Sequence, residues 1–225
     1  MMQAAARPPV ATPAAEAARY ALLRRLAPSM RHHLVVNLQP IGMVHEIMDR
    51  RLRAPEPNLA DVHDGVHKIN GYARAALASC LDIVTWLAPE GTARTTAAEG
   101  VAECLSLVQT GFTFRGFALR DELQPVAGEV SRAAFRHIVT ATLLQVTDEN
   151  APPAEIAISA RGETGSLVVT ISCKPTDGEQ GFATAPTYRP ITWNDVQALA
   201  AADGVQVERE GRSVRISLPW APANA

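Results

Sequence analysis

A heptad pattern of apolar and small residues, unbroken from residue 59 to residue 87, most constrains the fold of this chain. Spacings of three and four alternate through Leu59, Val62, Val66, Ile69, Ala73, Ala76, Cys80, Ile83 and Leu87. Four repeats of this spacing predict one long helix with a continuous seam. Asn58 is its expected N-cap, and the segment 89–91 (PEG) is its expected end.

The residues before this helix also follow a helical spacing, from residue 16 to about residue 54. The apolar positions are Leu23, Leu26, Met30, Leu34, Leu38, Ile41, Val44, Met48 and Leu52. We expect Pro28 and Pro40 to end or kink the helix locally, because proline lacks a backbone N–H. Residues 54–58 (APEPN) form a turn, so the two helices predict an antiparallel hairpin.

A single hairpin of this kind would leave much apolar surface exposed to water. Two hairpins from two chains would bury that surface in a four-helix bundle. The small residues Ala73, Ala76 and Cys80 at the centre of the seam would let a partner helix approach closely. We therefore expect a homodimer.

The pattern changes after residue 91 to alternating helices and strands. Helices are expected at 96–111, 131–147 and 193–202, and strands at 117–123, 155–160, 167–173, 205–208 and 213–218. This order predicts an α+β layer, with helices on one face of a mixed or antiparallel sheet. The helix at 131–147 is expected to bury one side, formed by Phe135, Ile138, Val139, Leu143 and Val146.

Three segments follow from these patterns. An Ala- and Pro-rich stretch at 1–15 is expected to be a disordered lead-in, 16–90 to form the hairpin domain, and 91–225 to form the α/β domain.

The net charge of −2 gives no electrostatic reason to bind nucleic acid, and no apolar run suits a membrane span. Three cysteines without a CxxC pair, and no signal-peptide core, favour a cytoplasmic protein without a thiolate metal site.

The segment 31–41 (RHHLVVNLQPI) carries the first part of a family resemblance. A helical hairpin followed by an α/β sandwich resembles the catalytic core of two-component sensor histidine kinases, over about residues 20–220. In that family the phosphoaccepting histidine is followed by apolar residues two, six and nine positions on. Counting from His32 gives Leu34, Leu38 and Ile41, whereas counting from His33 gives Val35, Gln39 and Gly42.

The resemblance therefore favours His32 as the phosphoacceptor and keeps His33 as the alternative. His33 has Asn37 four residues on, as in some branches of the family. Asn37 is expected either to orient the histidine site or to cap the helix near Pro40.

Two later segments complete the resemblance. Residues 135–148 are similar to the helix that carries the metal- and nucleotide-binding asparagine, and residues 196–220 are similar to the closing helix and hairpin. The position of the family's asparagine is occupied by Gln145 here. The family's aspartate that binds the adenine amino group falls near Pro175, and Asp177 could replace that aspartate only with a shift of two residues.

The glycine-rich phosphate loop of the family is also missing. Residues 188–193 (YRPITW) stand in its place, and a phosphate cradle needs free backbone N–H groups. These departures imply a degenerate pocket near Gln145, Asp148 and Asp177 with weak or absent ATP binding, so that no cofactor and no metal is expected. The fold class implied is thus a dimeric four-helix bundle followed by a degenerate histidine-kinase-type ATPase sandwich.

The resemblance implies a histidine phosphotransfer protein or a histidine-kinase-like pseudokinase. The family's dimeric histidine phosphotransferases pass a phosphoryl group between receiver aspartates, and they need an exposed histidine but no nucleotide pocket. The expected partner is a response-regulator receiver domain. Two alternatives stay open: a divergent but active ATP-dependent kinase using Gln145, Asp148 and Asp177, and a non-enzymatic dimeric regulator-binding module in which neither histidine matters.

Two further clusters have more than one interpretation. His63 and His67 have the i, i+4 spacing that can bind zinc, but they flank the seam, which favours a solvated edge. Arg50, Arg51 and Arg53 either complement the C-terminal dipole of the first helix or help to dock an acidic receiver.

Overall fold

The computed structural model describes residues 12–88, 91–182 and 186–222. The chain divides into two compact units, which are Leu26–Pro89 and the combination of Met1–Arg25 with Glu90–Ala225. We call them the hairpin unit and the sandwich unit. Most of the expected disordered lead-in lies outside the described residues, but residues 13–15 are already helical.

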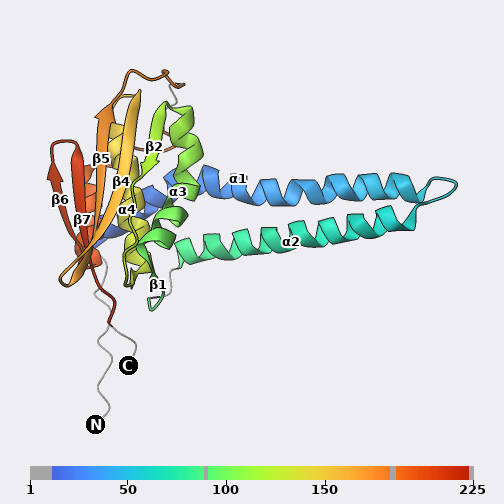
Figure 1. Cartoon of the computed structure of the whole chain (residues 1–225), viewed down its shortest axis with the longest axis horizontal. Helices are drawn as coiled ribbons and strands as arrows, with labels where there is room; N and C mark the ends of the chain where they lie inside the picture. The colour runs from blue at the N-terminus through green and yellow to red at the C-terminus, as the bar shows by residue number, and fades with distance from the viewer. Residues whose placement is uncertain (1–11, 89–90, 183–185, 223–225) are drawn as a thin grey trace, which may run out of the picture. The chain divides into compact units, whose positions relative to one another are not determined.

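The hairpin unit is built from two long helices (Figure 1). Helix α1 (Pro13–Leu52) continues through Pro28 and Pro40, so neither proline ends it, although each was expected to end or kink the helix. Each proline removes one backbone hydrogen bond, and the helical bonds of the turns on both sides maintain the helix. Helix α2 (Leu59–Leu87) has the predicted bounds, and the Asn58 side chain accepts a hydrogen bond from the Ala60 N–H at 3.0 Å.

The predicted seam of α2 divides into two rows. The row formed by Val62, Ile69, Ala76 and Ile83 is buried or half-buried, whereas the row formed by Leu59, Val66, Ala73, Cys80 and Leu87 is exposed. Helix α1 lies against the first row, because a Cβ atom on the buried Gly65 would overlap the Met48 side chain. One partner helix covers only one side of a heptad seam, which leaves the second row open to solvent.

The sandwich unit contains the remaining elements (Figure 1). They are β1 (Arg94–Thr95), α3 (Ala97–Phe114), β2 (Phe117–Asp121), β3 (Val130–Ser131), α4 (Arg132–Glu149), β4 (Ala154–Glu163), β5 (Ser166–Pro175), α5 (Trp193–Ala202), β6 (Gln206–Glu210) and β7 (Ser213–Pro219). The main sheet has the order β2-β4-β5-β7-β6, with β2 parallel to β4 and the other pairs antiparallel. The predicted α+β class and mixed sheet are confirmed.

Alternating burial shows that one face of the sheet is covered. Along β4 the buried residues are Ala154, Ile156, Ile158 and Ala160, and their neighbours are half-buried or exposed. Helices α3, α4 and α5 contact strands of this sheet. The small antiparallel pair β1–β3 was not predicted, because a strand of two residues has no periodic pattern to detect.

Helix α4 is buried on all sides, which corrects the prediction of a single buried side. Every residue from 134 to 147 is buried, including Arg136 and Gln145. The helix contacts α3 and α5 as well as the sheet, so its polar residues are enclosed along with its apolar ones.

The first turns of α1 belong to the sandwich unit, although the sequence assigned residues 16–25 to the hairpin domain. Ala15, Ala18, Ala21 and Leu22 are fully buried, and Arg19 forms an ion pair with Asp203 at 3.2 Å. Small residues on this side of α1 allow close packing. A continuous helical pattern cannot show where one helix passes from one unit to the next.

Candidate functional site

The two candidate acceptor histidines lie on different sides of α1. His32 is exposed and His33 is half-buried, and their ring centroids are 6.4 Å apart. Successive residues on a helix differ by about 100° in direction, so adjacent side chains do not share a face. His32 makes no hydrogen bond to any other described residue, which leaves its ring nitrogens accessible.

Asn37 lies on the side of α1 that faces α2. Its Nδ2 donates to the His33 carbonyl oxygen at 3.0 Å and to the Ser79 Oγ of α2 at 3.0 Å. Asn37 therefore ties the two helices together one turn after His33. Ser79 was not among the predicted site residues, although it is a hydroxyl residue close to the seam, between Ala76 and Cys80.

The residues expected around a nucleotide pocket do not form a metal-binding set. Gln145 is buried, and its Oε1 has no hydrogen-bond partner among the described residues. Asp177 lies in the exposed segment after β5. Across the described ranges, no group of three or more His, Cys, Asp or Glu residues could hold a metal ion.

Asp148, in the last turn of α4, is occupied by an ion pair. Its carboxylate is 2% exposed and accepts from Arg25 Nη1 at 2.5 Å and from Arg25 Nη2 at 2.9 Å. The Ile191 N–H also donates to Asp148 Oδ2 at 2.9 Å, and Arg115 Nη1 lies 3.8 Å from Oδ1. A carboxylate with this many donors around it has little capacity left for a metal ion.

The segment before α5 closes over the same ion pair. Arg25 Nη1 also donates to the Arg189 carbonyl at 3.3 Å, and the Tyr188 ring packs edge-on against Tyr20 with centroids 6.0 Å apart. The guanidinium of Arg24 lies 5.4 Å from the centroid of the Tyr188 ring. These contacts join the start of α1 to residues 188–189, in the segment before α5.

The N-terminus of α5 is capped by the chain's own carboxylate. Thr192 and Asp195 form a capping box, and Arg189 binds both Asp195 oxygens at 2.7 and 2.8 Å. Burial raises the pKa of Asp195, but hydrogen bonds from Arg189 and Thr192 outweigh it and hold that pKa below its usual value. A negative carboxylate thus occupies the helix end that would otherwise attract a phosphate.

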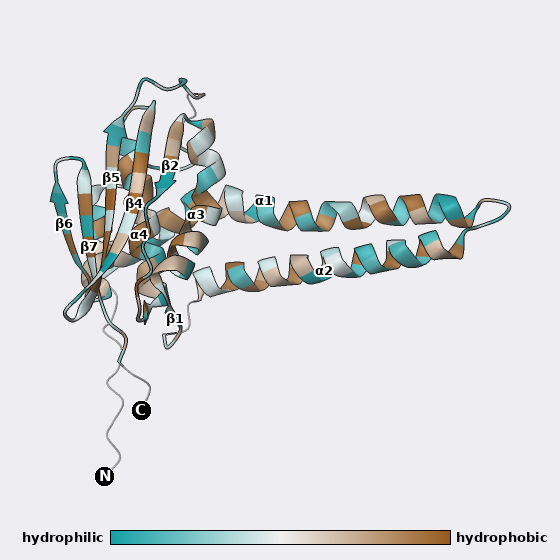
Figure 2. Ribbon diagram, viewed as in Figure 1, coloured by the Kyte–Doolittle hydropathy of each residue, from teal (hydrophilic) through white to brown (hydrophobic). Residues whose placement is uncertain are grey.

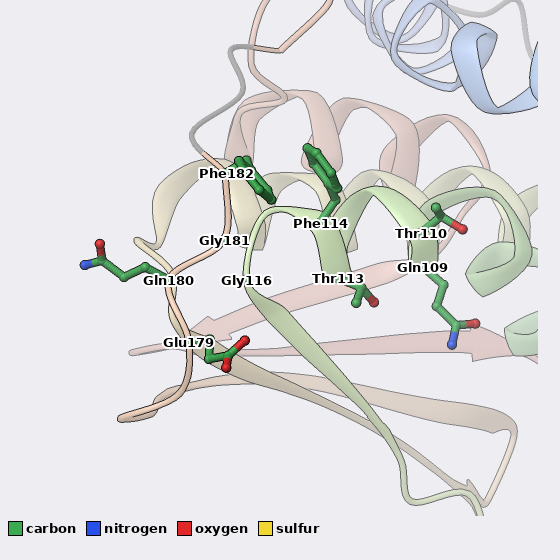
Figure 3. A pocket seen from close by; sticks show the side chains of 9 residues that line it. All are labelled: Gln109, Thr110, Thr113, Phe114, Gly116, Glu179, Gln180, Gly181 and Phe182. Atoms are coloured by element: carbon green, nitrogen blue, oxygen red, sulfur yellow. The ribbon is translucent and has the colours of Figure 1, made fainter.

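A separate open pocket of about 570 Å³ lies at the C-terminal end of α3 (Figure 3). Its lining consists of Gln109, Thr110, Thr113, Phe114, Gly116, Glu179, Gln180, Gly181 and Phe182. Phe114 and Phe182 are stacked, with centroids 4.6 Å apart, and the Phe182 N–H donates to the Phe114 carbonyl at 2.9 Å. The lining contains one carboxylate and no basic side chain, so it does not complement phosphate groups.

Comparisons with known proteins find similarity in solved structures only. No protein-family model matches the chain, and no curated protein matches it. The chain is similar to the histidine kinase AdeS of Acinetobacter baumannii, at 12% identity and a TM-score of 0.42, covering 82% of this chain and 98% of that one. It is also similar to a histidine kinase from Burkholderia phymatum STM815, at 16% identity and a TM-score of 0.43. That match covers 95% of this chain and 100% of the other.

A third similar structure is described as a bacterial phosphotransferase. It is 15% identical, with a TM-score of 0.40, and the match covers 88% of this chain and 95% of that chain. All three matches have an identity of 16% or less. None of the described helices is long and apolar enough to cross a membrane.

Proposed function

We propose that this chain is a cytoplasmic, homodimeric histidine phosphotransfer protein or histidine-kinase-like pseudokinase of two-component signalling. It would dock response-regulator receiver domains and carry a phosphoryl group on His32, without productive ATP binding. The observation that carries the proposal is a contrast between the two units. His32 is exposed to an incoming partner, whereas the Asp148 carboxylate of the expected nucleotide pocket is buried in an ion pair.

The proposed reaction needs little from this chain beyond an accessible imidazole. A neutral ring nitrogen of His32 attacks the phosphorus of an aspartyl phosphate on the receiver. The N–P bond forms as the bond from phosphorus to the receiver carboxylate oxygen breaks, and the carboxylate leaves with the electron pair. The reverse sequence of bonds delivers the phosphoryl group to a second receiver.

Asn37 would support this reaction as a positioning residue. Its amide donates to the His33 carbonyl and to Ser79, so it holds the turn of α1 that follows the acceptor against α2. The residue does not itself contact the His32 ring in the structure, and it would act through the helix backbone.

The sandwich unit supports the absence of productive ATP binding. A nucleotide at the position implied by the family would meet the Arg25–Asp148 pair, and its phosphates would meet the Asp195 carboxylate at the end of α5. Gln145 is buried too deeply to reach an exposed metal ion.

The exposed row of α2 supports a homodimer. It is extended by Leu77, Leu81 and Val84, which are 60%, 59% and 53% exposed, and apolar residues recur along both helices of the hairpin (Figure 2). Burial of each leucine is worth roughly 1.5–3 kcal/mol. The exposed row has the same heptad spacing as the row that packs against α1 within one hairpin. The exposed row of a second copy would therefore pack against it in the same way.

The dimer can be tested by light scattering. The wild-type chain is expected at twice its 24.1 kDa mass, and Leu77→Glu with Leu81→Glu is expected to shift it to the monomer mass. Lys68→Glu, at an exposed site outside the row, is the matched control. A compact wild-type monomer at micromolar concentration would refute the four-helix bundle.

The function is tested by phosphotransfer from phosphorylated receiver domains, with His32→Ala and His33→Ala compared. Acid-labile label that disappears only in His32→Ala supports the proposal, and loss only in His33→Ala assigns the other histidine. Label taken directly from ATP and Mg²⁺ would indicate the divergent kinase. No transfer from any receiver, together with unchanged signalling by the double histidine variant, would indicate a non-enzymatic binding module.

A further inference from the structure

Two histidines of α2 take no part in the proposed phosphotransfer. His63 and His67 are both exposed, their ring centroids are 4.4 Å apart and their Nε2 atoms are 3.3 Å apart. We propose that this pair is a chelating site for an exchangeable divalent transition-metal ion of the Zn²⁺ class.

The separation of the two nitrogens carries the proposal. Residues four apart lie on the same face of a helix, so both imidazoles can approach one ion. A tetrahedral zinc ion with Zn–N bonds of about 2.0–2.1 Å holds two ligand nitrogens about 3.3–3.4 Å apart. The His63 and His67 Nε2 atoms already lie at that separation, so metal binding requires no rearrangement of the helix.

Within a single chain, the pair is open to an ion. Gly65 lies between the two histidines in the sequence and is buried against Met48 of α1. His63 and His67 are each two residues from Gly65, or about 200° around the helix, so both lie on the side of α2 that faces away from α1. Among the described residues, each ring has only the other as a hydrogen-bond partner. In the absence of a metal, that contact is a hydrogen bond from one Nε2–H to the other Nε2, so the donor ring has to move this proton to its Nδ1 before both Nε2 atoms can bind one ion.

The ligand set predicts which ion binds and how firmly. No third His, Cys, Asp or Glu joins the pair among the described residues, so water would fill the remaining positions and the ion would exchange readily. Imidazole nitrogens suit zinc, copper and nickel, whereas magnesium prefers oxygen ligands. Mg²⁺ in a phosphotransfer assay is therefore not expected to compete.

The experiment is calorimetric titration of the full chain, with any affinity tag removed, using Zn²⁺ in the presence of excess Mg²⁺. We expect one saturable Zn²⁺ per chain and at least tenfold weaker binding in His63→Gln and in His67→Gln. His45→Gln, which removes an isolated exposed histidine of α1, is the control and should bind as the wild type does.

A second variant separates loss of the site from loss of helix stability. His63→Gln combined with Gly71→His places the second imidazole four residues after His67 instead of four residues before it. Gly71 has space for a side chain, because no atom lies within 4 Å of the position that its Cβ would take. Recovery of binding in this variant supports the chelate. Equal affinity in the wild type and in His63→Gln with His67→Gln, no saturable site in the wild type, or no recovery with Gly71→His would each overturn the proposal.

Discussion

Removing Arg25 is the most direct test of how the start of α1 is bound to the sandwich unit. The side chains of Arg25 and Asp148 are 5% and 2% exposed, and both guanidinium Nη atoms bind the carboxylate. Breaking a buried pair by removing one partner costs about 3–5 kcal/mol, because the other charge stays buried. Arg115 and the Ile191 N–H remain near Asp148, so we expect Arg25→Leu to cost about 3 kcal/mol.

The matched control is Arg19→Leu. Arg19 pairs with Asp203 through one contact of 3.2 Å, with side chains 30% and 22% exposed. An ion pair of this partly exposed kind is worth about 0–1 kcal/mol. The two variants remove the same type of side chain from the same helix, so the difference between them reports on the contacts of the buried Arg25 side chain with Asp148 and with the Arg189 carbonyl.

The assay is thermal and urea unfolding followed by circular dichroism, with hydrogen exchange of residues 132–149 to report on the sandwich unit. At about 2–4 °C per kcal/mol, Arg25→Leu should lower Tm by roughly 6–12 °C. Adding Asp148→Asn removes the uncompensated charge and should recover about 1–2 kcal/mol. The reasoning is refuted if Arg25→Leu costs no more than Arg19→Leu, or if Asp148→Asn destabilises the Arg25→Leu variant further.

Three further predictions follow from single contacts. Ser79→Ala, which removes the acceptor for Asn37, should cost about 1 kcal/mol and speed hydrogen exchange in the middle of α2, and unchanged exchange would contradict this. Iodoacetamide should leave Cys104 intact in the folded chain and modify it after unfolding in urea, as followed by mass spectrometry, because burial raises the pKa of the Cys104 thiol to about 12; equal rates in the folded and unfolded chain would contradict this. Asp195→Asn should destabilise the protein at neutral pH. The pKa of Asp195 is lowered on folding, so its stabilisation is present above the unfolded pKa of about 3.9 and is lost as pH falls through the lower folded pKa. A gap to the wild type that persists in urea unfolding at the lowest pH would argue against that cause.

Local signals in the sequence predicted the elements whose ends are set locally. Asn58 caps α2 and Thr192 caps α5, and both helices begin where those residues predict. The β4–β5 hairpin was predicted as well, although its turn is shorter than expected, because strand pairing continues to Glu163 opposite Ser166. Periodicity and capping act over a few residues, and the sequence displays them directly.

Features that depend on distant partners could not be predicted in the same way. Arg25 and Asp148 are 123 residues apart in the chain, and nothing in either local pattern indicates that they meet. The apolar residues of α4 predicted one buried side, whereas every residue from 134 to 147 is buried. For the candidate site, the spacing favoured His32, but only the packing of α1 against α2 distinguishes the exposed His32 from the half-buried His33.

The energetics of Asp148 favour phosphotransfer over ATP-dependent autophosphorylation as the proposed function. To coordinate Mg²⁺, Asp148 would have to release the Arg25 guanidinium, and leaving that group buried and unpaired costs about 3–5 kcal/mol. Each 1.4 kcal/mol is a factor of ten in affinity, so a nucleotide complex that used this carboxylate would be weakened by a factor of roughly 10²–10³. Transfer to the exposed His32 from a receiver that brings its own metal ion incurs no such cost. Under the proposed function, the hairpin unit would carry the phosphoryl group while Asp148 of the sandwich unit stays paired with Arg25.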